Sequence, residues 1–159
     1  MSNIIMPEII YQAHVRNKGW IRFNSNGEYA GYADDNSLPG IEALKIKVAG
    51  VYTGYLDMNT PRITYRAHVQ NLNWQDWRSD GGIAGTTGQS LRLEAIEIKL
   101  VNINQDLNPG LSVVYRAQVQ NQWQEWKRDG GTAGTTGRSL PIQAIQIRLT
   151  DARHPLPTP

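Results

Sequence analysis

The chain has 159 residues, of which 40% are hydrophobic and 19% are charged, with a formal net charge of +2. This composition excludes a disordered chain, and the length suits one domain, expected over residues 1–150. The chain has no cysteine, which excludes disulfides and thiolate metal sites. Lysine and arginine are scattered singly and form no basic run, so we expect no nucleic-acid partner.

Both ends of the chain carry local signals. Residues 1–14, MSNIIMPEIIYQAH, lack the basic and long apolar regions of a secretory signal peptide. No apolar run reaches the roughly 18 residues of a membrane helix, so we expect no membrane span. Neither feature identifies a compartment. The prolines of residues 151–159 predict an extended, poorly ordered tail.

Three segments of the chain resemble one another. Residues 65–100 read YRAHVQNLNWQDWRSDGGIAGTTGQSLRLEAIEIKL, and residues 115–149 read YRAQVQNQWQEWKRDGGTAGTTGRSLPIQAIQIRL. Residues 11–48 form a more divergent copy, with Phe23 where the others have Trp77 and Trp126. Repetition of this kind indicates units that bury their apolar faces against one another.

Each segment is predicted to consist of strands. It opens with apolar and polar residues in alternation, as at 65–70, which is typical of a half-buried antiparallel strand. A short strand with a tryptophan follows, then a predicted hairpin turn at an Asn-Gly or Asp-Gly pair. The Ala-Gly-Thr-Thr-Gly stretches at 84–88 and 133–137 predict a bulge or tight loop, before a second alternating strand as at 96–100. No segment has a helical period, so the fold is predicted to be all-β.

Three similar units predict a closed domain with pseudo-threefold symmetry. A unit of three or four strands cannot bury its apolar face alone, and closure also protects the sheet edges. A β-prism and a β-trefoil both meet these demands. We favour the β-prism because each unit reads as a self-contained meander with one polar face.

The repeated motif Y-R-A-H-V-Q-N, W-Q-x-W, D-G, A-G-T-T-G, S-L and A-I-x-I-x-L resembles the ChW repeat, the clostridial hydrophobic repeat with a characteristic tryptophan. Two copies match strongly and the first matches weakly. The resemblance implies a bacterial module that acts outside the cell or on its surface in adhesion or polysaccharide binding, often attached to an enzyme. Because we expect neither a signal peptide nor an attached enzyme, this chain is expected to be more similar to a small multivalent lectin.

The candidate ligand-binding residues are first the aromatic pairs. Residues three apart on a strand point to opposite faces, so one ring of each pair is expected in the core and the other near the surface. We expect the second ring of each pair to be the more exposed one. Exposed rings suit the faces and hydroxyls of sugars. The alternative is that both rings belong to the core. The pairs are Trp20 with Phe23, Trp74 with Trp77, and Trp123 with Trp126.

Polar candidates accompany these rings. Asp80 and Asp129 could accept hydrogen bonds from sugar hydroxyls, but Asn26 at the matching position favours a role in the turn. His14 and His68 are interpreted as polar contacts or plain surface residues on the outer face, because the third copy has Gln118 there and glutamine cannot replace a metal ligand. No metal site, cofactor or catalytic residue is therefore expected.

The sequence leads to two hypotheses from different classes. The first is a non-catalytic, lectin-like protein that binds cell-surface or polymeric glycans at up to three equivalent sites, with gain from multivalency. The second is a protein-interaction or structural surface module without sugar binding, and an oligomer is possible under either. A hydrolase would need an unrepeated acidic cluster, and residues 34–35 fit a solvated loop better.

Overall fold

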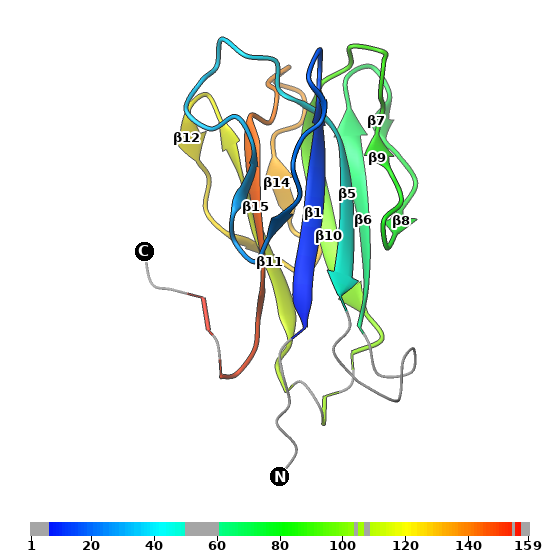
Figure 1. Cartoon of the computed structure of the whole chain (residues 1–159), viewed down its shortest axis with the longest axis vertical. Coiled ribbons are helices and arrows are strands. Elements are labelled where there is room, and N and C mark those ends of the chain that lie inside the picture. The colour runs from blue at the N-terminus through cyan, green and yellow to red at the C-terminus, as the bar shows by residue number, and fades with distance from the viewer. Residues whose placement is uncertain (1–6, 50–60, 104, 107–108, 154, 157–159) are drawn as a thin grey trace.

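The computed structural model describes residues 7–49, 61–103, 105–106, 109–153 and 155–156. These residues form strands, turns and loops without a helix, which confirms the all-β prediction. They make three antiparallel sheets of five strands each, and the described strands form no closed barrel. The long strands run side by side along the longest axis of the molecule (Figure 1).

The three sheets have corresponding strand orders. Sheet 1 has the order β2-β1-β5-β9, sheet 2 β7-β6-β10-β14, and sheet 3 β12-β11-β15-β4, while β3, β8 and β13 pair with β1, β6 and β11. The strands are β1 Glu8–Val15, β2 Gly19–Trp20, β3 Asn24–Ser25, β4 Tyr29–Gly31, β5 Ile41–Ala49, β6 Arg62–Val69, β7 Asn73–Trp74, β8 Arg78–Ser79, β9 Ala84–Gly85, β10 Leu93–Val101, β11 Ser112–Val119, β12 Gln122–Trp123, β13 Lys127–Arg128, β14 Thr132–Gly134 and β15 Ala144–Thr150.

In each sheet, the fourth strand comes from a repeated segment other than the one that supplies the remaining strands. β9 of the second segment pairs with β5, β14 of the third segment pairs with β10, and β4 of the first segment pairs with β15. The expectation of self-contained meanders is therefore wrong. Pairing across segments explains why it fails, because the period-two pattern shows which face of a strand is buried but does not identify its neighbour.

The core lies against the inner faces of all three sheets. Burial alternates along β1 and β6 in the predicted register, and the inward side chains of the three sheets join one hydrophobic cluster. The largest of them are three tyrosines at matching positions, Tyr11, Tyr65 and Tyr115, each at most 1% exposed.

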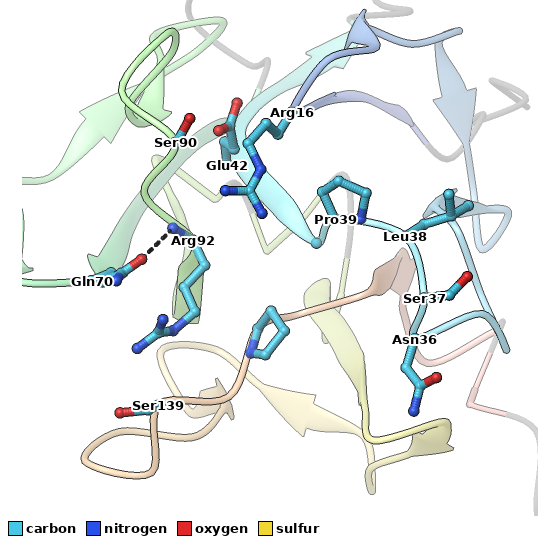
Figure 2. Close-up of a pocket in the computed structure, with 12 residues that line it drawn as sticks. Arg16, Asn36, Ser37, Leu38, Pro39, Glu42, Gln70, Ser90, Arg92 and Ser139 are labelled. Carbon is cyan, nitrogen blue, oxygen red and sulfur yellow. Dashed lines mark hydrogen bonds between the residues drawn. The ribbon is translucent and has the colours of Figure 1, made fainter.

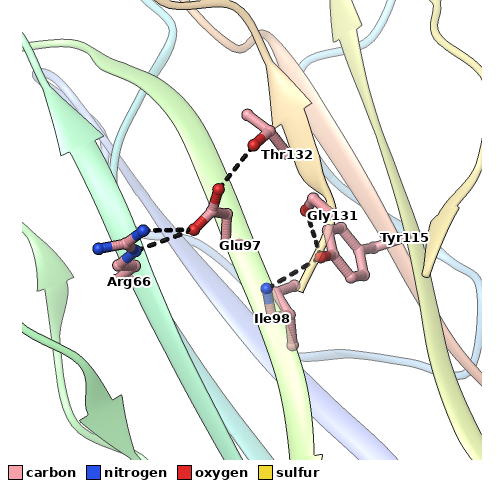
Figure 3. A network of polar contacts seen from close by, with 6 residues as sticks. All are labelled: Arg66, Glu97, Ile98, Tyr115, Gly131 and Thr132. Carbon is pink, nitrogen blue, oxygen red and sulfur yellow. Dashed lines mark hydrogen bonds and ion pairs between the residues drawn. The ribbon is translucent and has the colours of Figure 1, made fainter. Parts of the chain in front are cut away.

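These tyrosines join neighbouring sheets. The Tyr115 hydroxyl donates to the carbonyl of Gly131 and accepts a 3.1 Å hydrogen bond from the backbone N–H of Ile98 on sheet 2 (Figure 3). Tyr65 accepts from Ile46 of sheet 1 at 3.0 Å in the same way. Tyr11 of the first segment accepts from Ile147 of sheet 3 at 3.4 Å. We call these three tyrosine-centred contacts the seams.

A glycine at each fourth strand permits close contact between backbones. At Gly134, which has a φ of 90°, an added Cβ would lie 2.3 Å from the carbonyl oxygen of Glu94. A Cβ added at Gly31 would lie 2.3 Å from the carbonyl oxygen of Gln143, and one added at Gly85 would lie 2.2 Å from that of Glu42. The Ala-Gly pairs are therefore short strands at which only glycine fits beside the adjacent strand.

The predicted tail is described in part. Asp151 is buried, and its carboxylate forms a 2.9 Å ion pair with Arg153. Residues 154 and 157–159 lie outside the described residues, so the prediction of poor order is not tested there.

Candidate functional site

All five tryptophans lie half-buried outside the hydrophobic core. Trp74 faces His68 across the β6–β7 pair, on the polar side of sheet 2. Trp77 follows in a stretch without strand structure, so the alternation of a continuous strand does not apply to the pair. The prediction of one core ring in each pair is wrong, and so is the alternative of two core rings.

Exposure of the second ring differs between the segments. Phe23 is 66% exposed and Trp20 is half-buried, so in this pair the second ring is the more exposed one, as predicted. Trp77 and Trp126 are half-buried, like their partners. The outer faces of the sheets therefore carry the aromatic side chains that the sequence singled out, with both members of a pair accessible.

Cationic side chains contact these rings. The guanidinium carbon of Arg66 lies 4.7 Å from the ring centre of Trp74 and 4.9 Å from that of Trp77. Lys99 lies 4.2 Å from the Trp77 ring centre. At such distances a cation is attracted by the negative face of an indole ring, which fixes both partners. Sheet 2 thus presents a cluster of aromatic rings and positive charge.

Sheets 1 and 3 build similar clusters from other residues. Arg116 lies 4.9 Å from the ring centres of both Trp123 and Trp126. On sheet 1 the cation is Lys45, 4.0 Å from the ring centre of Trp20. The pairing of cation and ring therefore recurs, although its residues change.

Arg66 is also held by a polar network that spans two segments. Its Nη2 lies 2.8 Å from Oε1 of Glu97, and the other carboxylate oxygen accepts a 2.6 Å hydrogen bond from Thr132 of the third segment (Figure 3). The Arg66 side chain, which is about one-third exposed, is thus oriented by contacts in and beside its own sheet.

The histidines make polar contacts, as expected. His14 Nδ1 lies 3.0 Å from Glu42, and His68 Nδ1 lies 3.1 Å from Glu94. Each ring also packs edge-on against a tryptophan, with ring centres 5.2 Å apart for His14 and 5.3 Å apart for His68. The two histidines therefore buttress Trp20 and Trp74. The described residues include no group of three His, Cys, Asp or Glu side chains placed to hold a metal ion.

In the third segment a different pair replaces histidine and glutamate. The Gln118 side chain accepts a 2.7 Å hydrogen bond from the backbone N–H of Asp34 and donates a 2.7 Å hydrogen bond to its carboxylate. Asp34 thus attaches the loop of the first segment to sheet 3. This contact gives one of the two acidic loop residues a structural role.

The aspartates of the predicted turns have structural contacts. Asp80 and Asp129 adopt positive φ angles of 28° and 39°, and Asn26 has 40°. Asp129 Oδ1 accepts a 3.1 Å hydrogen bond from the N–H of Val113, and Asp80 makes the matching contact to Ile63. The backbone interpretation of these residues is confirmed.

Sequence reasoning missed Tyr29. This residue is 50% exposed, and its ring centre lies 6.5 Å from that of Trp123. It reaches sheet 3 because β4 of the first segment pairs with β15. In the repeat Tyr29 corresponds to Ile83 and Thr132, so the aromatic residue at this position is visible in the sequence. Its proximity to Trp123 depends on pairing between segments, which the repeat does not reveal.

The family model described as Clostridial hydrophobic W matches residues 68–102 and 118–151. These matches support the resemblance to ChW repeats for the second and third copies. No curated protein and no solved structure matches the chain. In the described part of the chain, no helix has the length and apolar character needed to cross a membrane.

Proposed function

We propose that this chain is a non-catalytic, lectin-like protein that binds polymeric or cell-surface glycans through the outer faces of its sheets. The observation that carries the proposal is that every tryptophan lies outside the core, on or beside a polar outer face. Half-exposed indoles next to arginine suit a ligand with apolar C–H faces and many hydroxyls. A solely structural role would favour rings in the core.

We further propose that residues 11–48 are a third copy of the repeat and that the three sheets form a β-prism with pseudo-threefold symmetry. Three features support this arrangement: the corresponding strand orders, the cyclic exchange of the fourth strand, and the three matching seams. Three weak sites on one rigid body would gain affinity for a polyvalent glycan through effective concentration.

The second and third copies are expected to bind best. Each presents two tryptophans that share one arginine, whereas the first has Phe23 and Lys45. Loss of one copy should weaken binding to a polymer more than binding to a monosaccharide, because only the polymer can bridge sites.

The test is glycan-array binding of the wild type and of the double variant Trp77→Ala plus Trp126→Ala. We expect at least a tenfold loss of polymer binding with an unchanged circular dichroism spectrum. Val101→Ala is the control for loss of an exposed apolar side chain: Val101 is 40% exposed and pairs with Arg62, whereas Trp74 pairs with His68 near the other end of β6. Equal binding by the wild type and the double variant would exclude the outer faces as the sites.

One observation favours the alternative of a protein-interaction module. The cations close to Trp74, Trp77 and Trp126 occupy ring surface that a sugar would otherwise cover. Under this hypothesis a discrete protein binds the polar faces, and free sugars do not compete. Pull-down followed by native mass spectrometry, with and without mixed monosaccharides, distinguishes the two functions.

A further inference from the structure

The outer face of sheet 3 carries an arginine that is held by a neutral partner. Arg116 on β11 donates a 2.6 Å hydrogen bond from Nε to the side-chain oxygen of Gln146 on β15. Gln146 itself donates a 3.0 Å hydrogen bond to the carbonyl of Gly27, so a neutral amide orients the arginine. Arg116 forms no ion pair with any residue that the structure describes. The residue is partly exposed, and its terminal nitrogens can donate further hydrogen bonds to a ligand.

The corresponding arginine of sheet 2 is balanced by an acid. Arg66 donates a 2.9 Å hydrogen bond from Nε to Glu97, and its Nη2 lies 2.8 Å from the same carboxylate oxygen. Arg66 lies opposite Glu97 in the ladder of sheet 2. Arg116 lies opposite Gln146 in the same way in sheet 3. The two sheets therefore place an arginine alike, and the exchange of glutamate for glutamine leaves its positive charge uncompensated on sheet 3.

A second arginine adds positive charge to the outer face of sheet 3. Arg148 lies two residues after Gln146 on β15, and residues at this spacing point to the same face of a strand. Neither β11 nor β15 contains an aspartate or a glutamate. Glu125 borders the face, but Asp76 has the matching position on sheet 2, so this acid does not cause the difference between the two sheets. The long strands of sheet 3 thus present two positive charges and no negative charge on this face.

The arginines of a pocket between the segments are matched by acids. This pocket of about 440 Å³ is lined by residues of all three repeated segments, among them Arg16 and Arg92 (Figure 2). Arg92 donates a 2.9 Å hydrogen bond from Nε to Glu94. Glu42 lies in the pocket wall together with Arg16. Two acids therefore offset the two positive charges of the pocket, so an anion is attracted there less than to the outer face of sheet 3.

Aromatic rings from two segments accompany the uncompensated arginine. The guanidinium carbon of Arg116 lies 4.9 Å from the ring centres of both Trp123 and Trp126. Tyr29 extends the group, at 6.5 Å from the ring centre of Trp123. Partial burial lowers the pKa of Arg116, because the charged form loses water and Gln146 supplies no negative charge in its place. A ligand anion would supply that missing partner through charge-assisted hydrogen bonds.

We propose that the outer face of sheet 3 binds an anionic glycan, in which Arg116 holds a carboxylate or phosphate and the aromatic side chains hold the sugar ring. This inference rests on the proposed function and adds to it the charge of the ligand. A guanidinium matches two oxygens of either anion, whereas Lys45, the cation beside the tryptophan of sheet 1, is a point charge. Sheet 3 is therefore expected to prefer an acidic polymer more strongly than sheets 1 and 2.

The test is surface plasmon resonance of the full chain on pairs of polymers that share a backbone and differ in charge. Polygalacturonate is compared with its methyl ester, and dextran phosphate is compared with dextran. We expect the acidic member of at least one pair to bind more tightly by about tenfold or more, the effect of a hydrogen bond to a charged group. A preference confined to polygalacturonate identifies a carboxylate as the source of the charge, and one confined to dextran phosphate identifies a phosphate.

The decisive variant is Gln146→Glu, which rebuilds in sheet 3 the ion pair of sheet 2 without loss of a side chain. It should reduce the preference for the acidic polymer about tenfold and leave binding of the neutral polymer unchanged. Gln89→Glu is the matched control, because it adds the same charge at an exposed position between β9 and β10. The reverse change on sheet 2, Glu97→Gln, should raise the affinity for the acidic polymer.

The outcomes separate this inference from the proposed function. Equal affinity for the acidic and neutral members of both pairs, or absence of binding to the acidic polymers, would overturn the inference, and a blank glycan array would overturn the proposed function as well. A Gln146→Glu variant that is folded by circular dichroism and keeps the wild-type preference would exclude Arg116 as the anion site. Polyglutamate that binds as tightly as the acidic polysaccharides would show that the face takes an acidic protein segment instead.

Discussion

The seams use the same residue type in every repeated segment, whereas the outer faces of the sheets use different ones. At each seam, a tyrosine of one segment binds the backbone of the preceding sheet, and the same residue type serves all three. On the outer faces the cation near the tryptophan is Lys45, Arg66 or Arg116, and the residue paired with the first tryptophan is histidine or glutamine. The residues that join neighbouring sheets are therefore of one type in all three copies, whereas the side chains on the outer faces differ between the copies.

The outer faces also differ in what the neighbouring segment adds. Sheet 3 receives Tyr29 beside Trp123, whereas sheet 2 receives Thr132, which binds Glu97. Sheet 1 receives Ile83, which is 43% exposed. The three faces share one backbone arrangement but offer different surfaces, so substitutions should affect stability at the seams and binding at the faces.

The largest loss of stability is expected from Gly134→Ala. The new Cβ would lie 2.3 Å from the Glu94 carbonyl oxygen, and the φ of 90° disfavours any side chain. We expect a loss of about 4 kcal/mol or more in unfolding free energy, measured by urea denaturation. Gly137→Ala is the control: it has a similar φ of 73° but open space around the new Cβ, and should cost about 1–2 kcal/mol. Equal losses would show that the close contact is unimportant.

Tyr115→Phe should cost about 3 kcal/mol. The substitution keeps the ring but leaves the buried N–H of Ile98 and the carbonyl of Gly131 without the hydroxyl. Urea denaturation measures the loss. Tyr29→Phe, at a half-exposed hydroxyl, is the control and should change stability by less than about 0.5 kcal/mol.

The seams should also make the fold sensitive to alkali. Burial, aided by the charge of Glu97, raises the pKa of Tyr115 from 10.0 to about 12, and burial also raises the pKa of Tyr65. Because the folded state favours the neutral hydroxyl, its contribution is complete below pH 10 and is lost as the pH rises toward 12. For Tyr115 that contribution is about 3 kcal/mol.

Denaturation at several pH values, followed with tyrosinate absorbance, measures this dependence. In Tyr115→Phe, the part of the loss of unfolding free energy at alkaline pH that is due to Tyr115 should disappear. The plot of unfolding free energy against pH should therefore fall less steeply above pH 10. A variant with the wild-type slope would show that Tyr115 titrates at its ordinary pKa.

A smaller effect is expected at the turns. Asp129→Ala removes the acceptor for the Val113 N–H and should cost about 1 kcal/mol, measured by thermal denaturation. Asp129→Asn should be nearly neutral, because Asn26 makes the corresponding contact in the first segment, to Ile9 at 3.0 Å. If the asparagine variant were as unstable as the alanine variant, the carboxylate charge would be what matters.

Much of the strand pattern could be predicted from the sequence. The alternation at Tyr65, Ala67 and Val69 gave the inner face of β6, because burial of one sheet face imposes a period of two. Asp80 and Asp129 were identified as turn residues, since a short polar side chain tolerates a positive φ.

The sites depended on information that is not local. Trp77 shares a face with Trp74 because the strand is interrupted between them, and periodicity alone does not reveal an interruption. Tyr29 meets Trp123, and Arg16 shares a pocket with Arg92, through contacts between segments. Such neighbours depend on how the sheets pair, which a pattern within one segment does not specify.

The smallest change in stability, and the sharpest test of the faces, is Tyr29→Ala. Half of this side chain is exposed, so unfolding free energy should change by less than about 0.5 kcal/mol. If sheet 3 binds glycan, removal of the aromatic ring beside Trp123 should weaken polymer binding roughly 2- to 10-fold, the effect of about 0.5–1.5 kcal/mol.

Ile83→Ala makes a matched deletion at the corresponding position beside sheet 1 and should have the smaller effect, because the first copy is expected to bind weakly. Surface plasmon resonance on an immobilised polysaccharide measures both variants, and equal losses would mean that the aromatic residue contributed by the first segment does not distinguish sheet 3.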